Sequence, residues 1–258
     1  MASSPIRFSD GAGYERLMGQ WSRDVGATFL DWLQPVSGLA WLDVGCGSGA
    51  FSALVLERCA PGSLLGIDPS EGQLDFARGR GLGPVATFKN GDAMQIDLPD
   101  HSVDVAVTAL VMHFMPDTSQ GVSEMARVVR PGGLVAAYTW SLETGGFPYE
   151  AVHRAMVVRG YEAPKPPHPE AGNANELVRL WQAAGLDDVR QQEISVSRMF
   201  RDFDHYWQTA TLSPRIAAVL SDLAPDQLAS VQNETRGRVA NPLMVTAHAN
   251  AVSGRVSA

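Results

Sequence analysis

The chain has 258 residues, of which 45% are hydrophobic and 19% charged, and its formal net charge is −8. This length suits one α/β domain, with or without insertions, and the apolar content is enough for an ordinary buried core. The negative charge argues against nucleic acid or an anionic membrane as a partner, because no basic field would attract a polyanion.

The first predicted element is a helix over residues 10–34, where apolar side chains recur at spacings of three and four. Strands and helices then alternate. The predicted strands span 39–45, 63–68, 85–89, 103–110 and 134–140, and the helices between them span 50–59, 71–80 and 118–129. Such alternation implies a parallel, doubly wound sheet with right-handed crossovers.

Beyond residue 141 the pattern loosens into a surface excursion rich in glycine and proline, which is part helix (149–159) and part loop. The remaining predicted elements are a helix over 175–184, a strand over 189–196, helices within 202–240 and a last strand over 245–252. The chain thus contains more than a simple series of strand–helix units.

The most informative stretch is Leu42-Asp-Val-Gly-Cys-Gly-Ser-Gly49, which reads as a buried strand that ends in a glycine-rich turn. Glycine adopts positive φ and lets a ligand approach the backbone closely, and the following helix offers unpaired N–H groups and a positive dipole end. The turn therefore predicts a nucleotide-like cofactor. Two alternatives remain open at this point, since Gly45-x-Gly47-x-x-Ala50 also fits the dinucleotide fingerprint and Asp68 lies at a ribose-binding distance in either case.

Asp43, two residues before the first glycine, separates these alternatives. A dinucleotide turn must leave room for a pyrophosphate, whereas a carboxylate at the end of the strand suits a cation such as the ammonium of a methionine tail. With Asp43, Gly45, Gly47 and Gly49 in place, the chain resembles the class I S-adenosylmethionine-dependent methyltransferases, in particular the small-molecule enzymes of the type 11 (UbiE-like) group.

Three further segments match this family. Asp68 stands at the end of the second predicted strand, where the family's acid binds both ribose hydroxyls through strong charge-assisted bonds. Asp92 stands where the family's acid accepts from the adenine amino group, and the backbone N–H of Ala93 or Met94 would bond to the adenine ring. The segment 130–133 is the family's structural turn before the fifth strand.

The resemblance implies S-adenosyl-L-methionine as the cofactor and a Rossmann-like, doubly wound, seven-stranded, mostly parallel sheet of order 3-2-1-4-5-7-6 with an antiparallel last strand and helical cap and insertions. Tyr14 and Trp21 lie in a segment similar to the cap helix of small-molecule methyltransferases, although packing on the sheet would explain the same apolar stripe. The expected cofactor-binding residues are Tyr14, Trp21, Asp43, Gly45, Cys46, Gly47, Gly49, Asp68, Pro69, Ser70, Asp92, Ala93, Met94, Ala109 and Leu110.

The expected organisation is a single methyltransferase domain over 1–258. It comprises N-terminal cap helices (1–38), a cofactor-binding core (39–141), a lid segment (142–174) and C-terminal strands (175–258) with a helical insertion at about 202–240. The acceptor would enter between the N-terminal helix and the lid and insertion. The aromatic residues of these segments favour an apolar or aromatic small molecule, although packing would explain them equally well.

The expected reaction is in-line displacement on the methyl carbon, accelerated mainly by proximity and desolvation. It requires no metal and no covalent nucleophile, and the two cysteines, Cys46 and Cys59, have no metal-ligand spacing. His113, just after the fourth strand, is the best-placed general base, although packing would also explain a histidine there.

Two rival functions remain: a non-catalytic module that binds S-adenosylmethionine as a sensor or scaffold, and, less favoured, a nicotinamide-dependent dehydrogenase. The segment 109–112 lacks the Pro-Pro run of enzymes that methylate base amines, which disfavours nucleic-acid acceptors. No apolar run approaches the ~20 residues of a membrane span, and the first ten residues do not resemble a signal peptide, so we expect a cytoplasmic protein. The acceptor, the methylated atom and the oligomeric state stay open.

Overall fold

The computed structural model describes residues 11–162, 166–240 and 242–258. Its centre is a seven-stranded sheet of order β3-β2-β1-β4-β5-β7-β6, in which β7 runs antiparallel to both of its neighbours and the other pairs are parallel. The predicted sheet is thereby confirmed. Its strands are β1 (Ala40–Val44), β2 (Ser63–Asp68), β3 (Ala86–Asn90), β4 (Val103–Ala109), β5 (Val129–Trp140), β6 (Leu186–Met199) and β7 (Met244–Val256).

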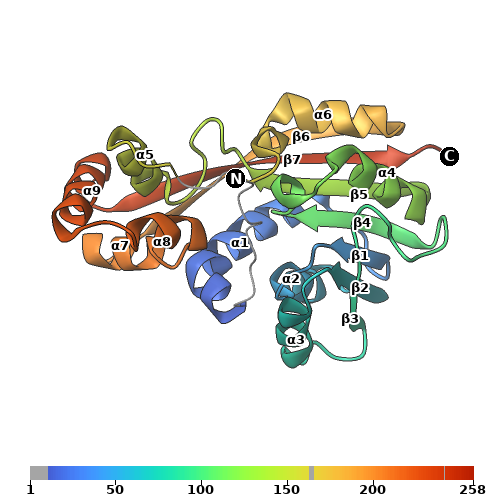
Figure 1. Ribbon diagram of the computed structural model, residues 1–258. Helices are drawn as coiled ribbons and strands as arrows, with labels where there is room; N and C mark the ends of the chain where they lie inside the picture. The colour runs from blue at the N-terminus through green and yellow to red at the C-terminus, as the bar shows by residue number, and fades with distance from the viewer. Residues whose placement is uncertain (1–10, 163–165, 241) are drawn as a thin grey trace.

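Helices cover both faces of the sheet (Figure 1). One face carries α1 (Gly11–Leu33), α2 (Ala50–Cys59) and α3 (Glu71–Gly79), and the other carries α4 (Thr118–Val128) and α6 (Ala174–Ala183). Apolar side chains form a separate core on each face. In α1 the buried stripe includes Trp21, Val25 and Phe29, none of which is exposed, so the helical periodicity of the sequence does identify the face that packs inward.

A group of helices packs around the part of β6 and β7 that extends beyond the rest of the sheet (Figure 1). It contains α5 (Glu150–Val158), α7 (Phe203–Ala210), α8 (Pro214–Leu220) and α9 (Pro225–Arg238). Proline opens α8 and α9, because its fixed φ suits the first helical turn and its missing N–H is not needed there. Strands β6 and β7 are longer than the predicted strands 189–196 and 245–252. They pair with each other along β6 from Leu186 to Met199, and one bulge interrupts the pairing.

One feature of the sheet positions the site. The parallel strands β1, β2, β3 and β4 all end at the same edge, where open α/β sheets bind ligands.

The predicted turn 130–133 lies inside β5. The register between β4 and β5 passes from the pair Val103–Val129 directly to the pair Val105–Leu134, so these residues bulge out of the ladder at the end opposite to the site. The short 3-10 helices η1 (Met112–Phe114) and η2 (Pro169–Gly172) complete the fold. In the described part of the chain, no helix combines the length and the apolar character that crossing a membrane requires.

Candidate active site

A glycine elbow connects β1 to α2. Gly45, Gly47 and Gly49 all have positive φ, at 74°, 51° and 75°. A Cβ on Gly45 would lie 2.7 Å from the Val111 side chain, and a Cβ on Gly49 would lie 3.0 Å from Ala77. Only glycine therefore fits these two positions, for reasons of both backbone conformation and space.

The elbow uses most of its own N–H groups inside the protein. Gly45 and Cys46 donate to the carbonyl oxygen of Ile67, at 2.8 and 3.0 Å, and Gly47 donates to Asp68 Oδ2 at 2.9 Å. A dinucleotide site presents such groups to a pyrophosphate. Here they tie the elbow to the end of β2 instead, which argues against the dinucleotide alternative.

Asp43 lies beneath the elbow and is only 2% exposed. Its Oδ2 accepts a 2.6 Å hydrogen bond from Ser52 Oγ, whereas its Oδ1 has no hydrogen-bond partner among the described residues. Burial, helped by the nearby Asp68 carboxylate, raises the pKa of Asp43 to about 7. A buried carboxylate with an unused oxygen requires a donor, preferably a cationic one.

Asp68 ends β2 and organises the neighbouring backbone. Its Oδ2 receives the Gly47 N–H and its Oδ1 the Ser70 N–H, each at 2.9 Å. Burial raises its pKa, and these two N–H donors oppose the effect. Because an ionised carboxylate has about four lone-pair positions, two remain for hydroxyl donors from a ligand.

Asp92 follows β3 and is exposed. Its Oδ1 accepts a 2.9 Å bond from the Met94 N–H. Of the two backbone N–H groups expected to serve an adenine ring, that of Met94 is thus already used, which leaves that of Ala93. The turn keeps the other Asp92 oxygen available at the rim of the site.

These acids surround a cavity of about 710 Å³ at the carboxyl edge of the sheet. Twelve of the predicted binding residues line it: Asp43, Gly45, Cys46, Gly47, Asp68, Pro69, Ser70, Asp92, Ala93, Met94, Ala109 and Leu110. The structure therefore brings together the residues that the sequence pattern placed at the ends of four different strands.

Two of the predicted cofactor-binding residues, Gly49 and Trp21, do not line this cavity. Gly49 serves the packing of the elbow against α3, as its closeness to Ala77 indicates. Trp21 is fully buried in the core, where its Nε1 donates to Tyr149 Oη at 3.3 Å and its ring packs near Phe200. The side chain of Tyr14 lies outside the described residues, although its backbone belongs to α1.

His113, the predicted general base, does not line the cavity either. It is 2% exposed, and its two ring nitrogens lie 3.0 Å from the His168 carbonyl oxygen and 2.9 Å from that of Trp140. Burial lowers the pKa of its imidazole. With both nitrogens directed at backbone carbonyls, His113 joins η1 to β5 and to the segment before η2 and presents no basic nitrogen to the cavity.

Sequence reasoning missed residues that reach the site from distant positions. Glu15 Oε1 in α1 accepts from Ser48 Oγ at 3.1 Å and forms an ion pair with Arg80, which follows α3. Arg80 Nε also donates to the Ser48 carbonyl oxygen. These contacts hold α1 against the elbow, and no local sequence signal connects their three segments.

One part of the cavity lining, here called the apolar wall, is mostly apolar. It includes Phe51, Phe114, Met115 and Tyr138, together with Ser22 from α1. The Ser22 hydroxyl is buried and has no partner among the described residues.

Comparison with known proteins finds similarity to methyltransferases. Residues 42–137 match the family model of a methyltransferase domain. The malonyl-[acyl-carrier protein] O-methyltransferase of Serratia marcescens is 35% identical over 128 residues, which cover 50% of this chain and 49% of that protein, so the chain spans about half the length of this curated relative.

Two solved structures share the fold at low sequence identity. The YcgJ protein of Bacillus subtilis is 17% identical with a TM-score of 0.62, and the match covers 93% of this chain and 99% of that one. Phosphoethanolamine N-methyltransferase 2 of Haemonchus contortus, in complex with S-adenosyl-L-methionine, is 16% identical with a TM-score of 0.59, covering 96% of this chain and 57% of that one.

Proposed function

We propose that this chain acts as a class I S-adenosylmethionine-dependent methyltransferase and transfers the methyl group of S-adenosylmethionine to a small-molecule acceptor. The match of residues 42–137 to a methyltransferase domain supports this proposal. The observation that carries this proposal is the buried Asp43 beneath the elbow, whose Oδ1 lacks a partner. The ammonium of a methionine tail is a donor of the required charge. Bound there, the cofactor supplies an activated methyl group on a sulfonium.

The chain's own residues divide the binding task among the strand ends. Asp43 holds the ammonium, Asp68 uses its two remaining lone-pair positions for the ribose hydroxyls, and Asp92 with the Ala93 N–H holds the adenine edge. The elbow supplies close backbone approach, and Pro69 and Ser70 border the ribose. This assignment uses polar groups that line the same cavity.

The acceptor side of the proposal rests on the apolar wall. Phe51, Phe114, Met115 and Tyr138 would contact an apolar or aromatic acceptor and exclude water from the methyl carbon. The aromatic residues of the lid and insertion do not supply this wall: Tyr149, for example, is fully buried in the core.

None of the described cavity-lining residues is histidine or lysine. We therefore propose that the protein contributes mainly by alignment and desolvation, and that the acceptor brings its own nucleophilic atom. In keeping with this function, we propose that the described chain forms one domain and acts in the cytoplasm.

The test measures transfer of labelled methyl from S-adenosylmethionine into a metabolite extract, together with calorimetry of S-adenosylhomocysteine binding. A protein that binds S-adenosylhomocysteine, the reaction product, but never transfers label is a sensor, which is the rival function. Asp68→Ala should weaken binding by about 1.5–3 kcal/mol, or roughly 10- to 150-fold, the contribution of charge-assisted hydrogen bonds. Asp75→Ala is the matched control, since Asp75 is an exposed acid on α3 that pairs with Arg78. Equal affinities of the two variants would remove Asp68 from the site.

A further inference from the structure

The loop over residues 91–102 joins β3 to β4 and carries Asp92, Ala93 and Met94 on the cavity. It contains no helix and no strand ladder, and its single β-bridge joins Asp92 to Gln95. Its backbone groups must therefore find hydrogen-bond partners elsewhere. Most of those partners come from one helix, α4.

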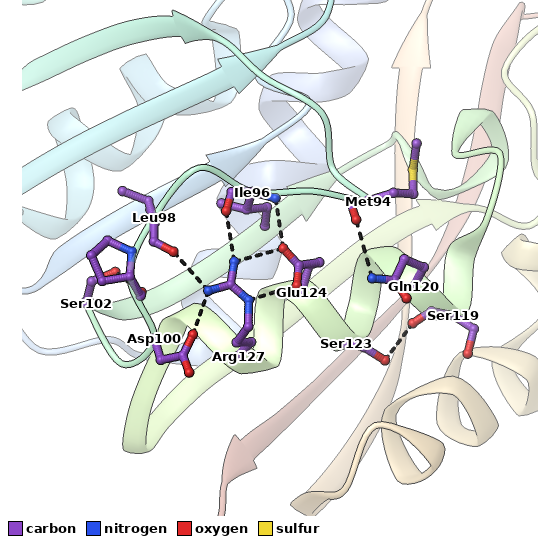
Figure 2. Close-up of polar contacts among 11 residues, drawn as sticks. Met94, Ile96, Leu98, Asp100, Ser102, Ser119, Gln120, Ser123, Glu124 and Arg127 are labelled. Carbon is purple, nitrogen blue, oxygen red and sulfur yellow. Dashed lines mark hydrogen bonds and ion pairs between the residues drawn. The ribbon is translucent and has the colours of Figure 1, made fainter.

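Arg127 near the end of α4 holds the middle of this loop (Figure 2). Its guanidinium donates to the carbonyl oxygens of Ile96 and Leu98, at 2.8 and 2.9 Å. It also donates to Asp100 Oδ1 at 2.7 Å. One planar group thus fixes three points spread over five residues, which the fork of an arginine allows and a lysine does not.

Glu124 completes the arrangement one turn earlier on the helix (Figure 2). Both of its oxygens accept from Arg127 at 2.8 Å, and Oε2 also accepts the Ile96 N–H at 2.8 Å. Its side chain is only 14% exposed, and the bonds from Arg127 lower its pKa, so it remains ionised. The backbone of Ile96 is therefore held at both its N–H and its C=O.

Gln120 extends the same helix face toward the cavity. Gln120, Glu124 and Arg127 lie at i, i+4 and i+7, so they form one row along α4. The Gln120 side-chain amide approaches the Met94 carbonyl oxygen at 3.4 Å. Met94 in turn donates its N–H to Asp92, which connects the row to the carboxylate at the cavity.

We infer that this row, with Arg127 as its main member, positions the loop that recognises the adenine base. The inference rests on the proposed function, because it assigns Asp92 to the adenine amino group. Arg127 is a positioning residue: it does not line the cavity but acts through the loop, whose hydrogen bonds to the base weaken steeply when their geometry shifts. Its effect should therefore fall on base recognition rather than on binding in general.

The experiment compares two ligands by calorimetry: S-adenosylhomocysteine, and S-inosylhomocysteine, in which a carbonyl oxygen replaces the amino group of adenine and the ring nitrogen N1 carries a proton. The wild-type protein should prefer the first by at least roughly 10- to 150-fold, the range for the lost bond to the charged Asp92, because N1 of the inosyl ligand can also no longer accept from the Ala93 N–H. Arg127→Gln should weaken S-adenosylhomocysteine until this preference is roughly threefold or less, and should leave S-inosylhomocysteine nearly unchanged. Arg179→Gln, which breaks a similar arginine–glutamate pair on α6, is the control and should keep the full preference.

Each outcome decides a different point. A merely structural role for Arg127 would weaken both ligands equally, and that result, or an unchanged preference, overturns the inference. A wild-type protein that binds both ligands equally also overturns it, because Asp92 would then not read the amino group. A wild-type protein that binds neither ligand removes the proposed function itself. Arg127→Lys keeps the charge without the fork and should give an intermediate preference, so it supplies the measurement if Arg127→Gln does not fold.

Discussion

Replacing Asp43 by asparagine should make the ligand-free protein more stable and its cofactor site weaker. The substitution keeps the size of the side chain, and the amide oxygen can still accept the bond from Ser52 Oγ. It removes a buried charge whose Oδ1 has no partner among the described residues. Burial raises the pKa of Asp43 from 3.8 to about 7. Since one pKa unit corresponds to about 1.4 kcal/mol, ionised Asp43 lowers the free energy of unfolding by about 4 kcal/mol well above pH 7.

The sign of this effect follows from the number of bound protons. Between about pH 4 and pH 7 the folded state keeps the Asp43 proton, whereas the unfolded state has released it. The stability contributed by this group is therefore present at low pH and is lost as the pH rises through that window. The asparagine variant lacks the group, so its stability advantage over the wild-type protein should grow by up to about 4 kcal/mol from pH 4 to pH 8.

Urea unfolding of the ligand-free proteins at several pH values measures this advantage, and Asp75→Asn, at an exposed acid, is the matched control. At pH 8 the Asp43→Asn variant should bind S-adenosylhomocysteine roughly 10- to 150-fold more weakly, because the ammonium has lost its charged partner. A stability difference that does not change with pH would refute the reasoning about burial. Unchanged affinity would refute the assignment of Asp43 to the ammonium.

Two further variants test the elbow and the helix above it. Gly45→Ala should lower the free energy of unfolding by about 1–3 kcal/mol more than Gly38→Ala, as measured by urea unfolding. Both glycines have positive φ, but only a Cβ at position 45 would meet another side chain, so an equal loss would contradict the close contact. Glu15→Gln should speed release of S-adenosylhomocysteine several-fold in stopped-flow measurements, because it removes the anion that pairs with Arg80 and helps to hold α1 against the elbow. Glu57→Gln breaks an exposed ion pair on α2 and should leave the release rate unchanged. Similar release rates for the two variants would show that the Glu15 contact does not hold α1 against the elbow.

The order of the strands and the position of the cavity could be predicted from the sequence. The strands that carry or precede the three acids are short, β1 and β2 are largely apolar, and each is followed directly by glycine or proline, so its end is visible in the pattern. Because parallel strands end at one edge, Asp43, Asp68 and Asp92 had to converge once the sheet order was known. The strand ends that can be recognised in the sequence thus predict both the fold and the location of the site.

The roles of Trp21 and His113 could not be predicted in the same way. A helical stripe identifies the buried face of α1 but not which of its residues meets the core and which meets the cavity. Trp21 packs against Tyr149 and Phe200, which come from segments more than a hundred positions away. The ring nitrogens of His113 contact the backbone carbonyl groups of residues 140 and 168, and the positions of backbone carbonyl groups cannot be predicted from a sequence pattern.

The three acids at the strand ends differ in what the fold gives them. Asp68 receives two backbone N–H donors, and Asp92 is exposed and receives one. Asp43 is the most buried and receives one hydroxyl. An unpaired buried charge is unfavourable until its counter-ion arrives, so the ligand-free protein carries at Asp43 an unfavourable free energy that a bound ammonium would remove. Under the proposed assignment, selectivity for a cationic tail would follow from the poor solvation of Asp43, whereas the ribose and adenine contacts would rely on acids that the protein or water already solvates.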